Sequence, residues 1–471
     1  MTAPATIGIP VARPRRRGTE LRLLLVALLV ALGARAAVDL GVTERVGFAT
    51  VPYVGGLAAL FAICHLAIRR WAGYADPLLL PLVAVLLAVG TAEIHRIDLA
   101  FPHGAADAPL QLVWVAVGVA LFVAVLVLLP DHRVLARYSY TAGLLGIALL
   151  LLPALLPASI SQVNGAKNWI RFAGFSIQPG EVAKLLLMVF FASYLVAKRS
   201  VLSLVTRRLG PLQLPRGRDL GPVLLAWLAS MLVLVQEKDL GQAILFFGIF
   251  LVVLYIATER LSWVLIGITL FVPGAVASYY AFGHVRERVD IWLHPFAGTN
   301  PQNSSYQLVQ GLYGFATGGI LGTGLGRGQP QTVPFARTDF IFSSIGEELG
   351  LVGVMAVLVI YLLLVGRGLR AAVGVRDSFG KLLAGGLAAS VALQVFVIVG
   401  GVMRVIPLTG VTLPFLSYGG SSVVANFVLV ALLIRISDAG RRPAVWPVAP
   451  TEQPGQAADK RRTEQPTGAR R

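Results

Sequence analysis

One acidic residue stands out in the sequence because no local structural task explains it. Asp339 lies in the run Thr338-Asp339-Phe340-Ile341-Phe342, with aromatic residues after it and a long apolar segment beyond. A carboxyl group at such a membrane edge loses hydration, which raises its pKa. A raised pKa suits a general base, the group that accepts a proton in the transition state. On the residues alone Asp339 is therefore a candidate catalytic base, and a structural role at the membrane edge stays open.

A second group of charges opens an apolar segment near residue 181. Pro179 suits the first turn of a helix. Glu181 and Lys184 are three residues apart, so they share one helical face and can pair. The pair either only stabilises the helix end or forms the polar wall of a cavity.

Three consecutive charges, Glu237-Lys238-Asp239, separate two short apolar segments. They are either the polar turn of a helical hairpin or a site that binds phosphate or a cation. Charged residues at the edge of membrane spans are costly, which favours a functional role beside the structural one.

Residues 164–171 lie just outside a further apolar segment and contain Lys167, Trp169 and Arg171. An interfacial loop with its tryptophan in the aromatic belt is the structural explanation. Contact with a polar substrate is the functional one.

Other charged residues have structural explanations. The run from Ser344 to Glu347 matches a capping box, which predicts a helix starting near 344. Glu347 and Glu348 would then lie in its first turn, where the helix dipole favours anions. Three polar residues at the end of the third apolar segment are interpreted as interfacial: Glu93, His95 and Arg96.

The chain that must position these residues has a composition suited to a membrane. Of its 471 residues, 56% are hydrophobic and only 13% are charged, whereas a soluble domain carries about 25% charged residues. Too few polar side chains remain to coat a water-facing surface, so we predict an all-α polytopic membrane protein. The single cysteine, Cys64, excludes an internal disulfide and zinc-type clusters.

About twelve segments are apolar and long enough for transmembrane helices, which need about 20 residues each. They are residues 21–39, 51–69, 77–95, 109–130, 138–156, 181–198, 221–236, 241–258, 261–282, 346–366, 382–403 and 411–435. Arginine and lysine gather in alternate connections, so these connections and both termini are predicted to be cytoplasmic. The same rule explains the net charge of +17, and no nucleic-acid partner is expected.

The remaining connections are then extracytoplasmic, and they carry the charged residues described above. The longest, residues 283–345, precedes the tenth predicted helix and is rich in glycine, glutamine and aromatic residues. Long loops of this kind are usually functional or disordered. The composition favours an ordered, partly re-entrant cap.

Several motifs occur in an order that resembles the shape, elongation, division and sporulation (SEDS) family, which includes RodA, FtsW and SpoVE. Each motif is weak alone, but together, in order and on the predicted outer face, they are specific. They are residues 164–171, 178–184, 238–241, 306–310, 317–319, 322–326, 338–342, 347–350 and 407–422. The two additional N-terminal spans are similar to the actinobacterial RodA type.

The resemblance suggests an organisation into four parts. They are a basic cytoplasmic N-terminus at 1–20, N-terminal helices with the two extra spans at 21–137, a catalytic membrane core at 138–437 and a disordered cytoplasmic tail at 438–471. The long loop at 283–345 belongs to the core.

The resemblance implies a peptidoglycan glycosyltransferase that polymerises lipid II into β-1,4 glycan strands at the outer face of the cytoplasmic membrane, in elongation or division. Lipid II is an undecaprenyl-pyrophosphate-linked disaccharide-pentapeptide. Its undecaprenyl chain lies in the bilayer, so membrane lipid is a further expected partner. The implied protein partner is a class B penicillin-binding protein, a transpeptidase. Asp339 matches the family's catalytic aspartate, and Glu181, Lys184 and Asp239 match residues of its central cavity. Residues 333–337 depart from the usual family sequence.

The expected reaction is an inverting displacement, because an α-linked pyrophosphate gives a β-linked product. Positive charge must stabilise the leaving pyrophosphate. Side chains supply it, or a divalent cation (magnesium or manganese) near Asp239 or Glu181 does; no organic cofactor is expected. The candidate cationic side chains are Lys167, Arg171, Lys184, Lys238, Arg286, Arg288 and Arg404.

The residues predicted to bind the substrate are Lys167, Trp169, Arg171, Glu181, Lys184, Lys238 and Asp239. Two alternatives from other functional classes remain. One is a lipid II flippase or another transporter, and the other is a non-enzymatic scaffold for a transpeptidase.

Overall fold

A computed structural model describes residues 17–101, 106–162, 167–172, 175–202, 207–209, 212–214, 228 and 240–443. The chain divides into two units. One unit, Pro14–Arg441, contains every helix and strand discussed below. The other combines Met1–Arg13 with Arg442–Arg471, and of these only residues 442 and 443 are described.

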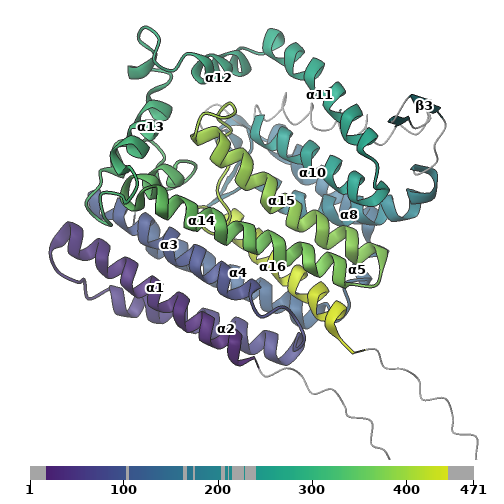
Figure 1. Ribbon diagram of the computed structural model, residues 1–471, viewed down its shortest axis with the longest axis horizontal. Coiled ribbons are helices and arrows are strands. Elements are labelled where there is room, and N and C mark those ends of the chain that lie inside the picture. Colours follow the sequence, from purple (N-terminus) through teal and green to yellow (C-terminus); the bar gives the residue numbers. More distant parts are fainter. Residues whose placement is uncertain are drawn as a thin grey trace, which may run out of the picture. The chain divides into compact units, whose positions relative to one another are not determined.

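Within the described residues, ten helices are long and apolar enough to cross a membrane (Figure 1). A helix satisfies its backbone hydrogen bonds internally, as hydrocarbon requires. The ten are α1 (Gly18–Thr43), α2 (Thr50–Trp71), α3 (Leu79–Ala100), α4 (Asp107–Leu128), α8 (Pro179–Leu202), α10 (Leu240–Thr258), α11 (Leu261–Ala281), α14 (Ile341–Gly374), α15 (Ser378–Val402) and α16 (Gly420–Arg441). The predicted all-α polytopic fold is confirmed.

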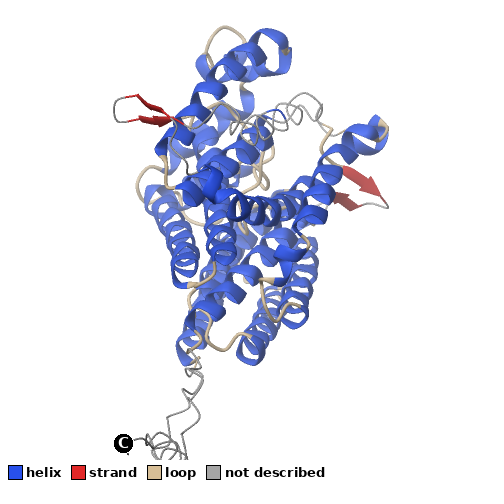
Figure 2. Ribbon diagram, turned by 90° about the vertical axis from the view of Figure 1, so that its right-hand side faces the viewer, coloured by secondary structure: helices blue, strands red, loops and turns tan. Residues whose placement is uncertain are grey.

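Shorter elements connect these helices. The helical ones are α5 (Val134–Arg137), α6 (Ser139–Leu155, apolar), α7 (Ala158–Ser161), α12 (Gly283–Leu293), η2 (Asn300–Gln302), α13 (Tyr306–Gly318) and η3 (Pro330–Thr332). Two antiparallel hairpins pair β1 (Ile170–Phe172) with β2 (Phe175–Ile177) and β3 (Arg207–Leu209) with β4 (Leu212–Leu214). Figure 2 shows these strands as two small red hairpins beside the helices.

Eleven of the twelve predicted segments coincide with helices. The remaining one, 221–236, lies outside the described residues except for Leu228. The count of twelve spans therefore stays a prediction. The start predicted at 411 for the last segment is wrong, because α16 begins at Gly420. Residues 411–419 instead form a largely buried, non-helical segment with a turn at 414–416. Tertiary bonds hold it, such as the one from Gln394 Nε2 to Thr412 O at 2.9 Å. At its other end, α16 continues to Arg441, beyond the boundary predicted at 438, and the tail from 444 lies outside the described residues.

Helices α15 and α16 lie at the centre of the helix packing, with 83% of the span of each buried by protein. Small residues let α15 approach its neighbours closely, as is common between membrane helices. A Cβ added to Gly386 would lie 2.3 Å from Met188 Sδ of α8 and 2.8 Å from Val253 of α10. By contrast, α1 exposes large apolar side chains such as Leu25 and Leu29, which suits a lipid-facing helix.

The helix ends gather at two levels. The level here called the Asp339 end comprises the C-terminal ends of α3, α11 and α15, the N-terminal ends of α4, α8, α10, α14 and α16, and residues 283–340 and 403–419. Contacts over long sequence distances, such as that of the Gln178 amide with Ser421 Oγ at 3.2 Å, hold it together.

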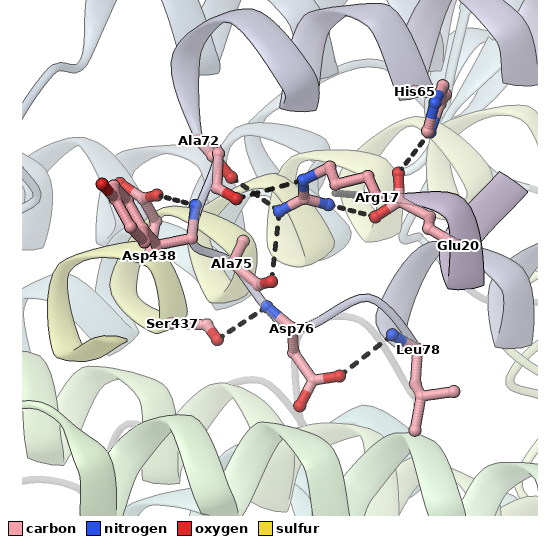
Figure 3. A network of polar contacts seen from close by, with 11 residues as sticks. Arg17, Glu20, His65, Ala72, Ala75, Asp76, Leu78, Ser437 and Asp438 are labelled. Carbon is pink, nitrogen blue, oxygen red and sulfur yellow. Dashed lines mark hydrogen bonds and ion pairs between the residues drawn. The ribbon is translucent and has the colours of Figure 1, made fainter. Parts of the chain in front are cut away.

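The opposite level, here called the Arg17 end, is fastened by a polar network (Figure 3). Arg17 donates to the carbonyl oxygens of Ala72 at 2.7 Å and Ala75 at 3.1 Å. The Asp76 amide donates to Ser437 Oγ at 3.0 Å. The connection between α2 and α3 is thereby tied to the start of α1 and to the end of α16.

Helix α14 is interrupted near its start. Gly350 has a φ of 65° and a ψ of −167°, which no helix contains. The chain after α13 fills the break: the Thr323 amide donates to Glu347 O at 3.0 Å, and the Leu351 amide donates to Gly319 O at 2.9 Å. The break therefore binds the segment after α13 to α14 through main-chain atoms.

Helix α1 packs against that same segment without intervening side chains. A Cβ on Gly41 would lie 2.5 Å from Leu325 O, and one on Gly326 would lie 2.8 Å from Val38 O. Gly326 also has a φ of 81°, a conformation that favours glycine. Backbone-to-backbone contact thus joins the first helix to the chain near residue 326.

Candidate active site

Asp339 lies in the turn directly before α14, and two side chains hold its carboxylate. Thr338 Oγ1 donates to Asp339 Oδ1 at 3.0 Å. Gln307 Nε2, from α13, donates to Asp339 Oδ2 at 3.4 Å and to Pro334 O at 3.2 Å. Gln307 therefore ties Asp339 to α13 and to the turn that precedes it.

The electrostatic environment of Asp339 matches its predicted role. Loss of hydration raises the pKa of Asp339 from 3.8 to about 6, although hydrogen bonds from Thr338 and Gln307 and the charge of Arg288 lower it. Asp339 is half-buried as a residue, while its carboxyl group is poorly hydrated.

Asp339 lines a hollow at the Asp339 end, together with α15 and the segment that follows it. The other lining residues are Phe340, Ile398, Gly401, Val402, Leu408, Thr409, Gly410 and Val411. The hollow holds about 170 Å³ of empty space, part of it open to solvent. Its interior has room for roughly one water-sized group, so it suits only the reacting part of a larger substrate.

Among the described cationic side chains predicted to stabilise pyrophosphate, Arg288 is the one whose charge acts on Asp339. It projects from α12, and its Nη1 donates to Leu408 O at 2.6 Å. Arg404 instead donates to the carbonyl oxygens of Trp292 and Leu293 and so braces α12.

Glu181 and Lys184 form a buried pair that is linked to this hollow through Gln394. Lys184 Nζ lies 2.9 Å from Glu181 Oε2 and donates to Gln394 Oε1 at 2.8 Å. Gln394 in turn donates to Thr412 O, and Val411, the preceding residue, lines the hollow. The predicted pair on one helical face is confirmed, and it reaches the Asp339 site through α15.

The other predicted substrate residues are not brought to Asp339 by any contact among the described residues. Arg171 is exposed on β1 and donates to the carbonyl oxygens of Ser159 and Gln162. Lys167 and Trp169 are partly exposed in the approach to β1. Arg286 is exposed on α12 and bonds Tyr280 O. Lys238 and Asp239 lie outside the described residues.

Among the described residues, no group of three His, Cys, Asp or Glu side chains lies together as a metal site would need, and Glu181 is paired with Lys184. The divalent cation and its ligands Asp239 and Glu181 stay a prediction.

The interfacial interpretation of Glu93, His95 and Arg96 is wrong, because tertiary partners draw them into the protein. Arg96 is 5% exposed and its Nε lies 2.9 Å from Glu348 Oε1. Glu93 is fully buried, and neither of its oxygens has a hydrogen-bond partner among the described residues. His95 Nε2 lies 2.8 Å from Asp39 Oδ1.

The predicted capping box is also wrong. Helix α14 begins at Ile341 rather than near 344, so Glu347 and Glu348 lie beyond its first turn. Ser344 Oγ has no hydrogen-bond partner among the described residues, and Glu347 accepts from the Gln329 amide at 2.6 Å. Contacts outside the helix, rather than its own N-terminus, occupy these carboxylates.

Sequence reasoning missed Gln307 and Gln394 as site residues. Gln394 lies in the apolar helix α15 and is 1% exposed. A polar side chain inside a membrane span indicates a functional position. Gln394 could therefore have been predicted from the sequence. Gln307 lies in the motif 306–310, but the motif does not identify its partner Asp339, which lies 32 positions further along the chain.

Together, these features define a polytopic helical membrane protein with a poorly hydrated carboxylate at one end of its helix bundle. Residues 74–442 match the cell cycle protein family of FtsW, RodA and SpoVE. The chain belongs to this family. Helices α1 and α2 precede the matched residues.

Curated relatives share most of the chain. It is 52% identical over 447 residues to the peptidoglycan glycosyltransferase RodA of Mycobacterium tuberculosis, a match that covers 94% of each chain. It is 32% identical over 378 residues to the stage V sporulation protein E of Bacillus subtilis, covering 78% of this chain and 98% of that protein.

A solved structure shares the fold. It belongs to a peptidoglycan synthase complex, and its description names the structural coordination of polymerization and crosslinking. The matching chain is 27% identical, with a TM-score of 0.61, and the match covers 77% of this chain and 97% of that one.

Proposed function

We propose that this peptidoglycan glycosyltransferase polymerises lipid II into β-1,4-linked glycan, with Asp339 as its general base. The observation that carries the assignment is the Asp339 carboxyl group itself. It lines a hollow, Thr338 and Gln307 orient it, and its pKa is raised to about 6. A base whose pKa lies just below neutral is deprotonated at neutral pH and still accepts a proton readily.

The reaction is a single displacement. The 4-hydroxyl oxygen of the acceptor sugar forms a bond to C1 of the donor sugar, and its proton passes to Asp339. The bond between C1 and the pyrophosphate oxygen breaks, and its electron pair leaves with undecaprenyl pyrophosphate. Attack from the face opposite the leaving group converts the α linkage into a β linkage.

Positive charge beside the hollow stabilises the leaving group. The charge of Arg288 acts on the Asp339 carboxyl, and Lys184 is linked through Gln394 to Thr412, the residue after Val411. Preorganised charges act strongly in a poorly hydrated site. If a divalent cation is also needed, a chelator will abolish activity, and magnesium or manganese will restore it.

We place the Asp339 end outside the membrane and both termini in the cytoplasm. Basic residues of the α2, α14 and α15 connections, among them Arg69, Arg70, Arg367 and Arg376, support this through the positive-inside rule. Cys64 is fully buried, so introduced cysteines can be labelled over a low background. A membrane-impermeant maleimide should label Arg327→Cys but not Arg376→Cys in whole cells; the reverse pattern would invert the topology.

The protein partner we propose is a class B penicillin-binding protein. The solved complex that resembles this chain couples polymerization with crosslinking, and a polymerase on one membrane face needs a transpeptidase on the same face. Whether the strands serve elongation or division then depends on which transpeptidase binds.

The testing experiment is glycan polymerisation by the purified full-length chain in nanodiscs, with its transpeptidase, lipid II and divalent cation. Glycan ladders from the wild type and none from Asp339→Asn would support both the activity and the base. Glycan ladders from both proteins would show that the chain polymerises lipid II without Asp339 as its general base. No ladders from either, with intact partner and lipid, would favour a flippase or a scaffold.

A further inference from the structure

The turn that carries Asp339 is fastened by the side chain two residues before it. We propose that Arg337 is a positioning residue, which sets the place of the Asp339 carboxyl by anchoring its turn to α3 and α4. This inference rests on the proposed role of Asp339 as general base.

The anchor on the α3 and α4 side consists of two carboxylates. Arg337 Nη1 pairs with Asp107 Oδ2, the first residue of α4, and lies 3.6 Å from Asp98 Oδ1 near the end of α3. The side chains of Asp98 and Asp107 are 10% and 12% exposed, and that of Arg337 is 31% exposed. Because the pairs are partly buried, water screens them less than it screens a surface ion pair.

Both carboxylates are themselves held in place. Asp98 Oδ2 accepts a bond from the Ala108 amide at 2.7 Å. Asp107 accepts a bond from the Tyr418 hydroxyl, and burial together with this carboxylate raises the pKa of Tyr418. A negative charge on the first residue of a helix is also favoured by the helix dipole. Arg337 therefore binds to a preformed acidic site rather than to mobile side chains.

The main chain of the same turn is anchored on its other side. Arg337 O accepts a bond from the Tyr418 amide at 2.7 Å, and Thr338 O accepts a bond from Ser417 Oγ. Asp339 is the next residue. The turn is thus held between α3 and α4 on one side and residues 417–418 on the other.

The turn needs such support because its backbone is strained. Phe335 has a φ of 57°, which is unfavourable for a bulky residue. Its carbonyl oxygen accepts bonds from the Thr338 amide at 2.9 Å and the Phe340 amide at 3.3 Å, which close the turn around Asp339. Strained turns persist where surrounding contacts fix them, and Arg337 supplies the ionic part of those contacts.

Arg337 acts through position, whereas Arg288 acts on Asp339 through its charge. If the Arg337 anchor is lost, the turn relaxes and the Asp339 carboxyl gains water. Its pKa then falls from about 6 toward 3.8. The acid limb of the pH–rate profile should therefore move to lower pH, while the maximal rate falls because the base is displaced.

The experiment uses the full-length chain in nanodiscs, with kcat, KM and the pH profile of polymerisation as readouts. Arg337→Gln should lower kcat about 10- to 100-fold, the scale expected for a small misplacement of a reacting group. KM should change far less, and the acid limb should move toward lower pH. Arg337→Lys should retain more activity than Arg337→Gln, because it can still reach one carboxylate.

A double-mutant cycle tests the anchor itself. Asp107→Asn should also lower kcat, and the double variant Arg337→Gln/Asp107→Asn should be no slower than Arg337→Gln alone, because both changes break one interaction. Arg327→Gln is the matched control: it removes an exposed arginine of the same loop region and should leave kcat and the pH profile unchanged.

Three results would overturn the proposal. They are wild-type kcat in Arg337→Gln, a double variant whose loss is the product of the two single losses, and an equal loss at every pH with a lowered melting temperature. If Arg337→Gln does not fold, the isosteric Asp107→Asn decides by the same readouts. Asp339→Asn is run in parallel, because ladders from that variant would reject the base itself, whatever Arg337 does.

Discussion

Arg96 Nε lies 2.9 Å from Glu348 Oε1, and this pair joins α3 to α14 across 252 positions of the sequence. Glu93, one turn earlier on α3, is fully buried in the same region. The guanidinium of Arg96 is therefore placed to balance buried negative charge between two central helices. Buried ion pairs of this kind contribute most visibly when one member is removed.

Replacing Arg96 by glutamine should destabilise the protein strongly. The change leaves Glu348 buried without its cation, and breaking a buried pair costs about 3–5 kcal/mol. The measurement is the melting temperature of the purified protein, with yield from the membrane as a second readout. Arg327→Gln, which removes an exposed arginine, is the control. An unchanged melting temperature in Arg96→Gln would mean that the pair contributes nothing to stability.

Asp339→Asn should be at least as stable as the wild type while it loses polymerisation. At neutral pH the wild-type carboxylate carries a desolvation cost, which raises its pKa to about 6. The amide has the same shape and avoids that cost, a gain of about 1 kcal/mol after solvent screening is allowed for. Thermal unfolding at neutral pH measures it. A clear fall in melting temperature would show that the charge stabilises the fold instead.

The rate of polymerisation should fall on the acid side of pH 6. The base must be deprotonated, and the raised pKa of Asp339 keeps the proton bound up to about pH 6. One pH unit below the pKa, roughly a tenth of the carboxyl groups are deprotonated, so kcat should fall about tenfold per unit. Glu287→Gln, an exposed acid on α12, should not alter this limb. A profile that stays flat down to pH 4 would exclude Asp339 as the titrating base.

Lys184→Met should lower stability more than the double variant Glu181→Gln/Lys184→Met. The single change leaves the Glu181 carboxylate buried without its cation at 2.9 Å, whereas the double change removes both charges. Melting temperatures measure the difference, and Lys381→Met, an exposed lysine at the Arg17 end, is the control.

Activity of the same double variant separates structure from substrate handling. If Lys184 contributes charge to the leaving pyrophosphate, the double variant regains stability but not polymerisation. If stability and polymerisation return together, the pair serves the fold alone, and Lys184 does not handle the substrate.

The sequence was sufficient to predict features that depend on neighbours along the chain. The helices follow from apolar runs of the length a bilayer requires. The pairing of Glu181 with Lys184 follows from their spacing on one helix. The unusual setting of Asp339 was visible because the aromatic residues that follow it are adjacent in sequence.

Features that depend on distant partners were not predictable. The capping signature at Ser344 fits a local template, yet Arg96 and the Gln329 amide occupy the two glutamates that follow. Arg96 itself looked interfacial because nothing nearby in sequence indicates a partner 252 positions away. A single sequence carries no record of such pairs, so burial and pairing emerge only when the helices are packed.

The contact between Gly41 and Leu325 has a consequence for how the protein is made. Helix α1 leaves the ribosome first, but the surface it must fit is synthesised almost three hundred residues later. Until then, its C-terminal part has no backbone partner at residues 325–326. In the folded protein, the late segment therefore packs on a helix made long before it. Removing α1 would take away this packing surface, even though α1 precedes the residues that match the family.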